Sequence, residues 1–278
     1  MTNDKTYSIL LTGASGVGKS TVIRGALETF GSGAIVLAPG SDEADSYLGL
    51  IGRPSFVFKG FDDTLYQPSL GDKVATGHTD MVRWLKAIYL EVRADVDAGK
   101  PPRYAVLGID TLSAVGRLAY NATLSKFGLS EPPAAIGSSG APFYSFLRNV
   151  LESGVRLMRA IRGCGVHWVV ASHPTEAEVT AIQDTSGIKS KIMPDLPGGF
   201  KNVLPSFFPV VLDIAIDDKG KHFARWSGDP RRVTKSRFGA LALTPKIELP
   251  AGAKNSWLAI QTAIDSAIEK LTNTEGIT

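Results

Sequence analysis

The sequence predicts an α/β fold: a mostly parallel, twisted sheet with helices on both faces and a late antiparallel hairpin. Apolar, β-favouring runs recur at residues 7–11, 33–38, 104–109 and 165–172. Segments with helical spacing of apolar residues separate these runs, which indicates that crossover helices join the strands. Strands that are apolar throughout are typical of parallel sheets covered on both faces.

The remaining elements follow in chain order. Apolar spacing predicts helices over residues 20–27, 79–98, 111–127, 143–161 and 257–271. The stretches 210–216 and 221–226 flank the turn 217–220, and this pattern predicts the hairpin at the sheet edge. Residues 175–204 show no clear period and predict a mobile loop with room for a short strand or hairpin.

Composition favours one elaborated domain. The 278 residues are 44% hydrophobic, which is ample for a large core, and no low-complexity linker divides them. We expect a core over residues 1–240 and a C-terminal extension with an amphipathic helix over residues 241–278. The one cysteine, Cys164, excludes an intramolecular disulfide and predicts a buried thiol. No apolar run approaches the roughly 20 residues of a membrane span, so we expect a cytoplasmic protein with no membrane partner.

A phosphate-binding pattern follows the first predicted strand. Residues 13–20 match GxxxxGK[ST] at every specified position, and a helix is predicted directly after them. Glycines let backbone N–H groups turn toward phosphates, Lys19 can reach the terminal phosphates, and the Ser20 hydroxyl can coordinate Mg²⁺. The alternative is a glycine-rich turn with an exposed lysine. The expected nucleotide-binding residues are Gly13, Ala14, Ser15, Gly16, Val17, Gly18, Lys19, Ser20 and Thr21.

Asp110 directly follows the buried run 104–109, where a Walker B aspartate would hold the metal together with Ser20. Its alternative role is the N-cap of the helix that begins near Thr111, and the two roles are compatible. The residue after Asp110 is Thr111 rather than an acid. This counts against the AAA+ type of ATPase, in which a catalytic glutamate usually follows the metal aspartate.

The order of these elements resembles the RecA-like ATPases. It comprises the phosphate loop, a short second strand, Asp-Thr-Leu-Ser at 110–113, Ser172-His173, the late hairpin and Thr-Lys-Ser-Arg at 234–237. Phage-encoded RecA-like proteins, including Sak-type single-strand annealing proteins, are the most similar group, and KaiC and DnaB helicases are more distant. The resemblance covers about residues 7–240 and implies a RecA-like P-loop NTPase fold that uses ATP and Mg²⁺.

The resemblance also implies two roles beyond the phosphate loop. His173 lies where relatives carry a polar sensor of the γ-phosphate, although a strand-end histidine is as often a structural group. Lys235 and Arg237 resemble the cations that one subunit donates to its neighbour's site, where they would stabilise charge during phosphoryl transfer. Their alternative is a solvated basic turn. The implied partners are single-stranded DNA, further copies of the chain in a ring or filament, and a single-strand-binding protein.

One position departs from the RecA-like pattern. Relatives place a glutamate that orients the attacking water at or just past the second strand. This chain offers Glu43 or Asp42 several residues later. Glu43 is therefore the candidate base, and hydrolysis is predicted less firmly than binding.

Candidate DNA-binding residues follow His173. Lys189, Lys191 and Lys201 can neutralise phosphates without reading sequence. A basic run and three aromatic residues could contribute, although neighbouring aspartates dilute the charge and phenylalanines beside prolines are often core. These further candidates are Lys219, Lys221, Arg225, Arg231, Arg232, Phe200, Phe207 and Phe208.

Three functions fit these patterns. The first is an oligomeric RecA-like ATPase that acts on single-stranded DNA in recombination, annealing or repair. The second is a nucleotide-gated scaffold with little hydrolysis and no DNA contact, which the displaced glutamate motivates. The third is a small-molecule kinase, for which the chain lacks an arginine-rich lid or acceptor-site motif.

Overall fold

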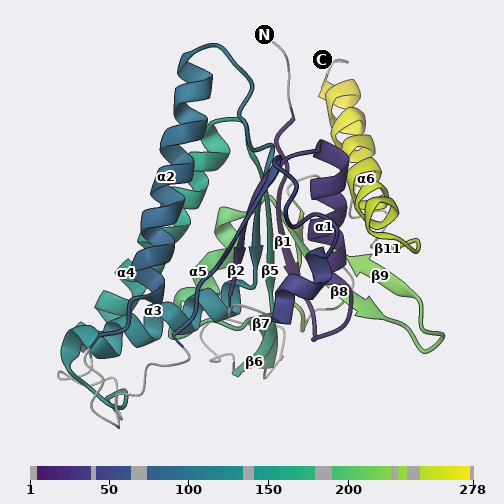
Figure 1. Cartoon of the computed structure of the whole chain (residues 1–278). Helices are drawn as coiled ribbons and strands as arrows, with labels where there is room; N and C mark the ends of the chain where they lie inside the picture. Colours follow the sequence, from purple (N-terminus) through teal and green to yellow (C-terminus); the bar gives the residue numbers. More distant parts are fainter. Residues whose placement is uncertain are drawn as a thin grey trace.

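A twisted sheet forms the middle layer of the molecule (Figure 1). The structure is a computed structural model that describes residues 5–38, 42–63, 74–133, 141–178, 190–226, 229, 231–236 and 245–275. The described strands of this sheet are β1 (Ser8–Thr12), β2 (Gly33–Leu37), β3 (Phe56–Gly60), β4 (Val106–Asp110), β5 (His167–Ser172), β8 (Val210–Ile216), β9 (His222–Arg225), β10 (Lys235–Ser236) and β11 (Lys246–Glu248). Their order across the sheet is β11-β9-β8-β1-β5-β4-β2-β3, and β10 pairs with β8.

The predicted fold class is confirmed. Neighbouring strands from β3 through β8 along the sheet are parallel, whereas β9, β10 and β11 join by antiparallel pairing. The β8–β9 pair is the late hairpin that the sequence predicts. The edge strand β3 was not predicted, because its apolar run is only the three residues 56–58 and its five residues are half-buried or exposed.

Helices cover both faces of the sheet (Figure 1). One core cluster joins the sheet to α2 (Gly77–Asp97), α3 (Leu112–Phe127) and α4 (Ala141–Gly163), and it includes the buried Cys164. The other joins it to α1 (Lys19–Phe30), the 3-10 helix η1 (Asp42–Tyr47) and α6 (Ala253–Glu275). No helix within the described ranges is long and apolar enough to cross a membrane.

Part of the segment expected to be a mobile loop is ordered. It forms a two-stranded antiparallel sheet from β6 (Pro174–Glu178) and β7 (Ser190–Pro194), followed by α5 (Phe200–Val203) and the 3-10 helix η3 (Leu204–Phe207). Phe200 and Phe208 are 1% and 0% exposed, so they belong to the core and cannot stack on bases. The ring of Phe208 lies against Trp168, with centroids 4.3 Å apart.

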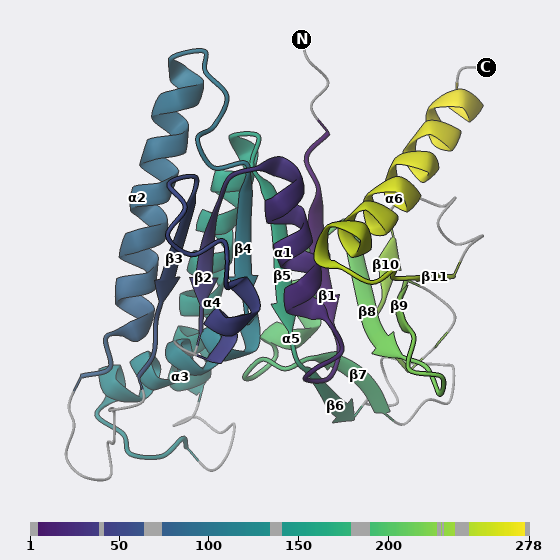
Figure 2. The same ribbon diagram turned by 45° about the vertical axis from the view of Figure 1, so that its right-hand side comes forward.

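The C-terminal helix α6 lies along α1 (Figure 2). Trp257 is fully buried there, and its ring makes edge contacts with Tyr7 and Phe30. Gly25 of α1 faces the first turn of α6, so the two backbones approach closely at this point. The predicted boundary at residue 240 stays a prediction, although β11 and α6 both pack against elements of the core.

Gly25→Ala is expected to lower the melting temperature, because the added Cβ would collide with the carbonyl oxygen of Ala253 and lie 2.8 Å from Cβ of Trp257. Overpacking of this kind costs about 1–3 kcal/mol. Thermal unfolding followed by circular dichroism measures the effect. Gly163→Ala, at the exposed end of α4 with no heavy atom within 4 Å of the new Cβ, is the matched control. Equal melting temperatures for the two variants would contradict close packing of α1 on α6.

Candidate functional site

The turn between β1 and α1 needs glycine at positions 13 and 18, among others. Gly13 has φ +152°, and a Cβ there would collide with the carbonyl oxygen of Ile214. Gly18 is the N-cap of α1, with φ +103°. Side chains at either position would strain the backbone. The loop can therefore present the N–H groups of the α1 N-terminus to an anion.

Lys19 is held by the carbonyl groups of its own loop. Its Nζ donates hydrogen bonds of 2.7 Å to the carbonyl oxygens of Gly13 and Ala14, and the residue is 5% exposed. Burial lowers the pKa of Lys19, while the negative charge of Asp110 acts in the opposite direction. A desolvated ammonium bonded only to neutral carbonyls is stabilised further by an anion. Phosphate oxygens are therefore suitable ligands for it.

Asp110 ends β4 and is 1% exposed. The Tyr47 hydroxyl donates a hydrogen bond of 2.9 Å to its Oδ2, whereas Oδ1 has no hydrogen-bond partner among the described residues. Burial raises the pKa of Asp110, and hydrogen bonding from Ser20 and Tyr47 opposes this. A buried carboxylate oxygen beside the Ser20 hydroxyl provides the oxygen ligands that Mg²⁺ prefers, so these residues fit the metal that the loop implies.

Two residues near Asp110 were missed or misassigned from the sequence. The N-cap of α3 is Thr111, whose Oγ1 accepts a hydrogen bond from the backbone N of Ala114, so Asp110 does not serve as that cap. Tyr47 lies in a polar stretch without a clear period, and nothing in the sequence indicated that its hydroxyl would reach Asp110.

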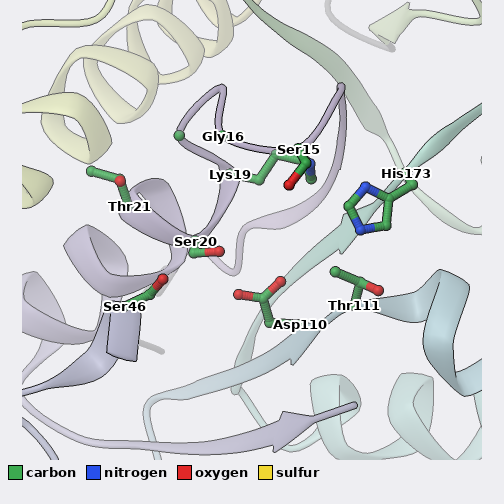
Figure 3. Close-up of a pocket in the computed structure, with 10 residues that line it drawn as sticks. Ser15, Gly16, Lys19, Ser20, Thr21, Ser46, Asp110, Thr111 and His173 are labelled. Atoms are coloured by element: carbon green, nitrogen blue, oxygen red, sulfur yellow. The ribbon is translucent and has the colours of Figure 1, made fainter. Parts of the chain in front are cut away.

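His173 follows β5 and faces the phosphate loop (Figure 3). Its backbone N donates to Oγ of Ser113 at 2.9 Å, and that oxygen lies 3.0 Å from Oγ of Ser172. Burial lowers the pKa of His173, and the positive charge of Lys19 lowers it further. Both effects favour the neutral form of the ring.

One cavity of about 400 Å³ brings most of the predicted phosphate-loop residues together with Asp110 and His173 (Figure 3). Its described lining residues are Ser15, Gly16, Gly18, Lys19, Ser20, Thr21, Ser46, Asp110, Thr111 and His173. Ser46 and Thr111 are the members that the sequence did not assign to the site.

Other predicted residues lie elsewhere. Lys191 is on β7, Lys201 is in α5 and Lys235 is on β10, and none of the three lines this cavity. Lys189 and Arg237 lie outside the described residues. Glu43 is in η1, and its side chain lies outside the part of the chain that the structure describes.

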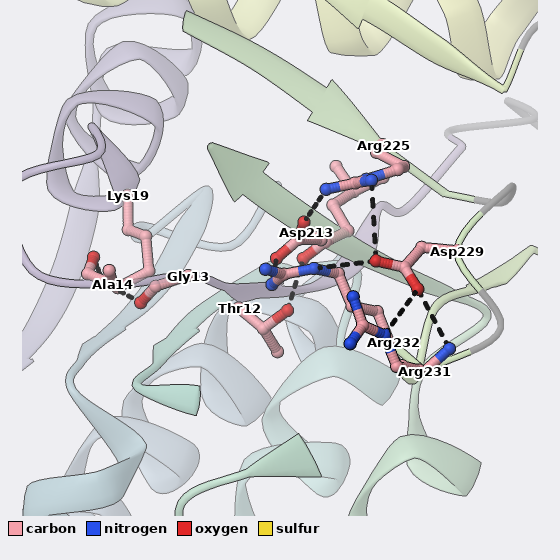
Figure 4. A network of polar contacts seen from close by, with 10 residues as sticks. Thr12, Gly13, Ala14, Lys19, Asp213, Arg225, Asp229, Arg231 and Arg232 are labelled. Carbon is pink, nitrogen blue, oxygen red and sulfur yellow. Dashed lines mark hydrogen bonds and ion pairs between the residues drawn. The ribbon is translucent and has the colours of Figure 1, made fainter. Parts of the chain in front are cut away.

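Two arginines of the basic run expected on the DNA-binding surface, Arg225 and Arg232, form ion pairs inside the fold (Figure 4). Asp213, 1% exposed on β8, accepts hydrogen bonds of 2.9 Å from Arg225 and 2.8 Å from Arg232. Both guanidinium groups also form ion pairs with Asp229. Removing either arginine would leave a buried charge short of a partner. We therefore assign these two arginines a structural role, contrary to the expectation from the sequence.

Comparison with known protein families assigns the chain to a family. A family model described as an AAA domain (AAA_24) matches residues 5–238. The chain belongs to this AAA-domain family. None of the curated proteins compared with the chain matches it.

Among solved structures, the AAA-domain chain is similar to one described as the crystal structure of the RadB recombinase. The identity is 11%, the match covers 90% of this chain and 89% of that chain, and the TM-score is 0.40. The family membership and the geometry of the phosphate loop together identify the chain as a P-loop ATPase domain with a nucleotide site.

Asp110→Asn is expected to raise the melting temperature of the nucleotide-free AAA-domain protein by a few degrees, because it removes a buried charge and keeps an acceptor for Tyr47. It is also expected to abolish the Mg²⁺-dependent part of the stabilisation by ATP. Thermal melts with ATP, with and without Mg²⁺, measure both effects. Asp80→Asn, the same change at a partly exposed position in the first turn of α2, is the control. An unchanged Mg²⁺ response in Asp110→Asn would rule out Asp110 as a metal ligand.

Proposed function

We propose that this chain is an oligomeric, RecA-like ATPase that acts on single-stranded DNA in recombination, annealing or repair. One observation carries the proposal: the β6–β7 hairpin is attached directly to the phosphate cavity. His173 lines the cavity and precedes β6, and its carbonyl oxygen accepts a hydrogen bond of 2.8 Å from the backbone N of Asp195, just after β7. Both ends of the hairpin therefore meet at His173, so a change at the phosphates can be transmitted to it.

Lysines of this region supply the proposed DNA contacts. Lys191 is on β7 and Lys201 is in α5, which follows the hairpin. Ammonium groups there would neutralise backbone phosphates without reading base sequence. We include Lys189 in the same proposal because it directly precedes β7 in the sequence.

Hydrolysis would use the cavity residues in separate roles. Lys19 and the loop N–H groups would bind the phosphates, and Ser20 and Asp110 would hold Mg²⁺, which neutralises charge on the phosphates when bound. His173 would sense the γ-phosphate, and Glu43 of η1 is the proposed base. Other subunits complete the site in this proposal.

Lys235 and Arg237 are the proposed contribution from a neighbouring subunit. Lys235 does not line the cavity of its own chain, and its Nζ donates to the carbonyl oxygen of Pro205 at 3.3 Å. The sequence resemblance supports a ring or filament that brings this strand to the next site. It also supports a phage-encoded or phage-derived protein in the bacterial cytoplasm, with a single-strand-binding protein as a further partner.

A nucleotide-gated scaffold is the second candidate function. Asp110 is the one carboxylate among the described residues that line the phosphate cavity. A site without a carboxylate base would bind ATP and turn it over slowly. ATP binding would then drive assembly of the chain, without repeated cycles of hydrolysis on DNA.

Binding to fluorescent oligo-dT tests the DNA part. Affinity is expected to rise with Mg-ATP and to fall with salt. Lys191→Ala/Lys201→Ala should reduce the slope of log affinity against log salt by about 1.4, since each contact to a single strand contributes about 0.7. Fluorescence anisotropy at several salt concentrations measures the slope. Lys86→Ala/Lys254→Ala removes the same charge from exposed positions and is the control. If oligo-dT fails to bind at low salt with and without ATP, the DNA part is wrong.

Mixing two variants tests the contribution from the neighbouring subunit. Lys19→Ala should lose nucleotide binding and Lys235→Ala should lose turnover while still binding ATP, so each alone releases little phosphate. Their mixture is expected to regain turnover, because Lys19→Ala subunits supply Lys235 to intact sites. Lys254→Ala is the control for the lost charge, and light scattering reports assembly. A mixture as inactive as its parts would contradict the trans role, and ATP-dependent assembly of a wild type that releases little phosphate would favour the scaffold.

A further inference from the structure

A second cavity of about 360 Å³ lies against the other side of the phosphate loop. Gly18 and Thr21 line both this cavity and the phosphate cavity, so the two spaces meet at the first turn of α1. Val17 of the phosphate loop also lines this cavity. The remaining walls come from the β8–β9 turn with the start of β9 and from the connection between β11 and α6, and they include Lys221, His222, Leu249 and Ala251.

The residues that line the phosphate cavity indicate that a bound phosphate chain would run toward the second cavity. In Figure 3, Thr21 lies on one side of Ser20, and Asp110 and His173 lie on the other. If Asp110 and Ser20 hold the metal at the terminal phosphates, the remaining end of the phosphate chain extends past Thr21. Whatever is attached to the first phosphate therefore arrives at the second cavity.

His222 presents a hydrogen-bond acceptor in this cavity. Its Nδ1 lies 2.8 Å from the carbonyl oxygen of Val17, and because a carbonyl can only accept, Nδ1 must carry the proton. In the neutral ring Nε2 is then an acceptor, and no group in the described part of the chain donates to it. A ligand with O–H or N–H donors would satisfy it, as the hydroxyls of a ribose or the amine of adenine can.

The walls of the cavity are held in place by hydrogen bonds of their own. The backbone N of Leu249 donates to the carbonyl oxygen of His222 at 2.8 Å, and Oγ of Ser256 donates to the carbonyl oxygen of Pro250 at 2.8 Å. At the rim, Lys221 and Glu248 form an ion pair of 2.9 Å. A cavity of this volume with fixed polar groups is within the range of small-molecule sites.

We propose that the second cavity binds the nucleoside, ribose and base, of an ATP whose phosphates lie on residues 13–20. This rests on the proposed nucleotide binding and adds where the adenosine lies and which residues recognise it. The acceptor on His222 favours a nucleoside rich in donors. The residues that form the outer wall, 248–256, lie beyond the part of the chain matched by the AAA-domain family.

Comparing Mg-ATP with Mg-tripolyphosphate separates the two cavities. Ala251→Trp places a large side chain in the nucleoside cavity from an exposed position of its outer wall. It should weaken ATP binding at least about tenfold and change tripolyphosphate binding by less than about twofold. Isothermal titration calorimetry measures both ligands. Ala98→Trp, the same change at the exposed C-cap of α2, is the matched control and should alter neither affinity.

His222→Phe is the second variant, because it keeps a ring and removes the acceptor. It should also weaken ATP and spare tripolyphosphate. Unchanged ATP affinity in both variants would overturn the proposal, and so would equal losses for both ligands, since the substitutions would then act on the phosphate loop. If the wild type binds neither ligand, the proposed nucleotide binding itself is wrong.

Discussion

The parallel register of the central strands is the constraint on which the candidate site depends. Thr12 pairs with Ser172 and Leu37 pairs with Asp110, so the ends of four strands meet at one edge of the sheet. A slip of one residue would turn Asp110 to the opposite face of the sheet and away from Ser20. The apolar strands therefore position the chemistry as well as the core.

The buried charges of Lys19 and Asp110 at this edge of the sheet lower the stability of the nucleotide-free protein. Burial lowers the pKa of Lys19 and raises the pKa of Asp110, so it favours the neutral form of each group. The attraction between the two opposite charges opposes both shifts only in part. An anion bound at Lys19 and a cation bound at Asp110 would relieve both. A ligand that binds only the folded state stabilises it, so the same residues that weaken the nucleotide-free protein link its stability to occupancy.

Local pattern was enough to predict the parts of the site that are contiguous in the sequence. Residues 13–20 carry their glycine spacing within one turn, and Asp110 is marked by the apolar strand before it. Tyr47 and the pairing of Arg225 with Asp213 could not be predicted, because each depends on residues brought together by the sheet. Charged residues in a basic run look solvated in a sequence, and only the fold shows which carboxylate they meet.

Helix α1 links the two cavities to the C-terminal segment. Its first turn, with Gly18 and Thr21, lines both spaces, and two turns later Gly25 lets the start of α6 approach closely. The loop before α6 is thereby held beside the phosphate loop. Since the family match ends at residue 238, the phosphate-binding part and the outer wall of the second cavity lie in separate parts of the sequence. If the second cavity binds the nucleoside, residues 13–20 would bind the phosphates and the C-terminal segment would select the nucleoside.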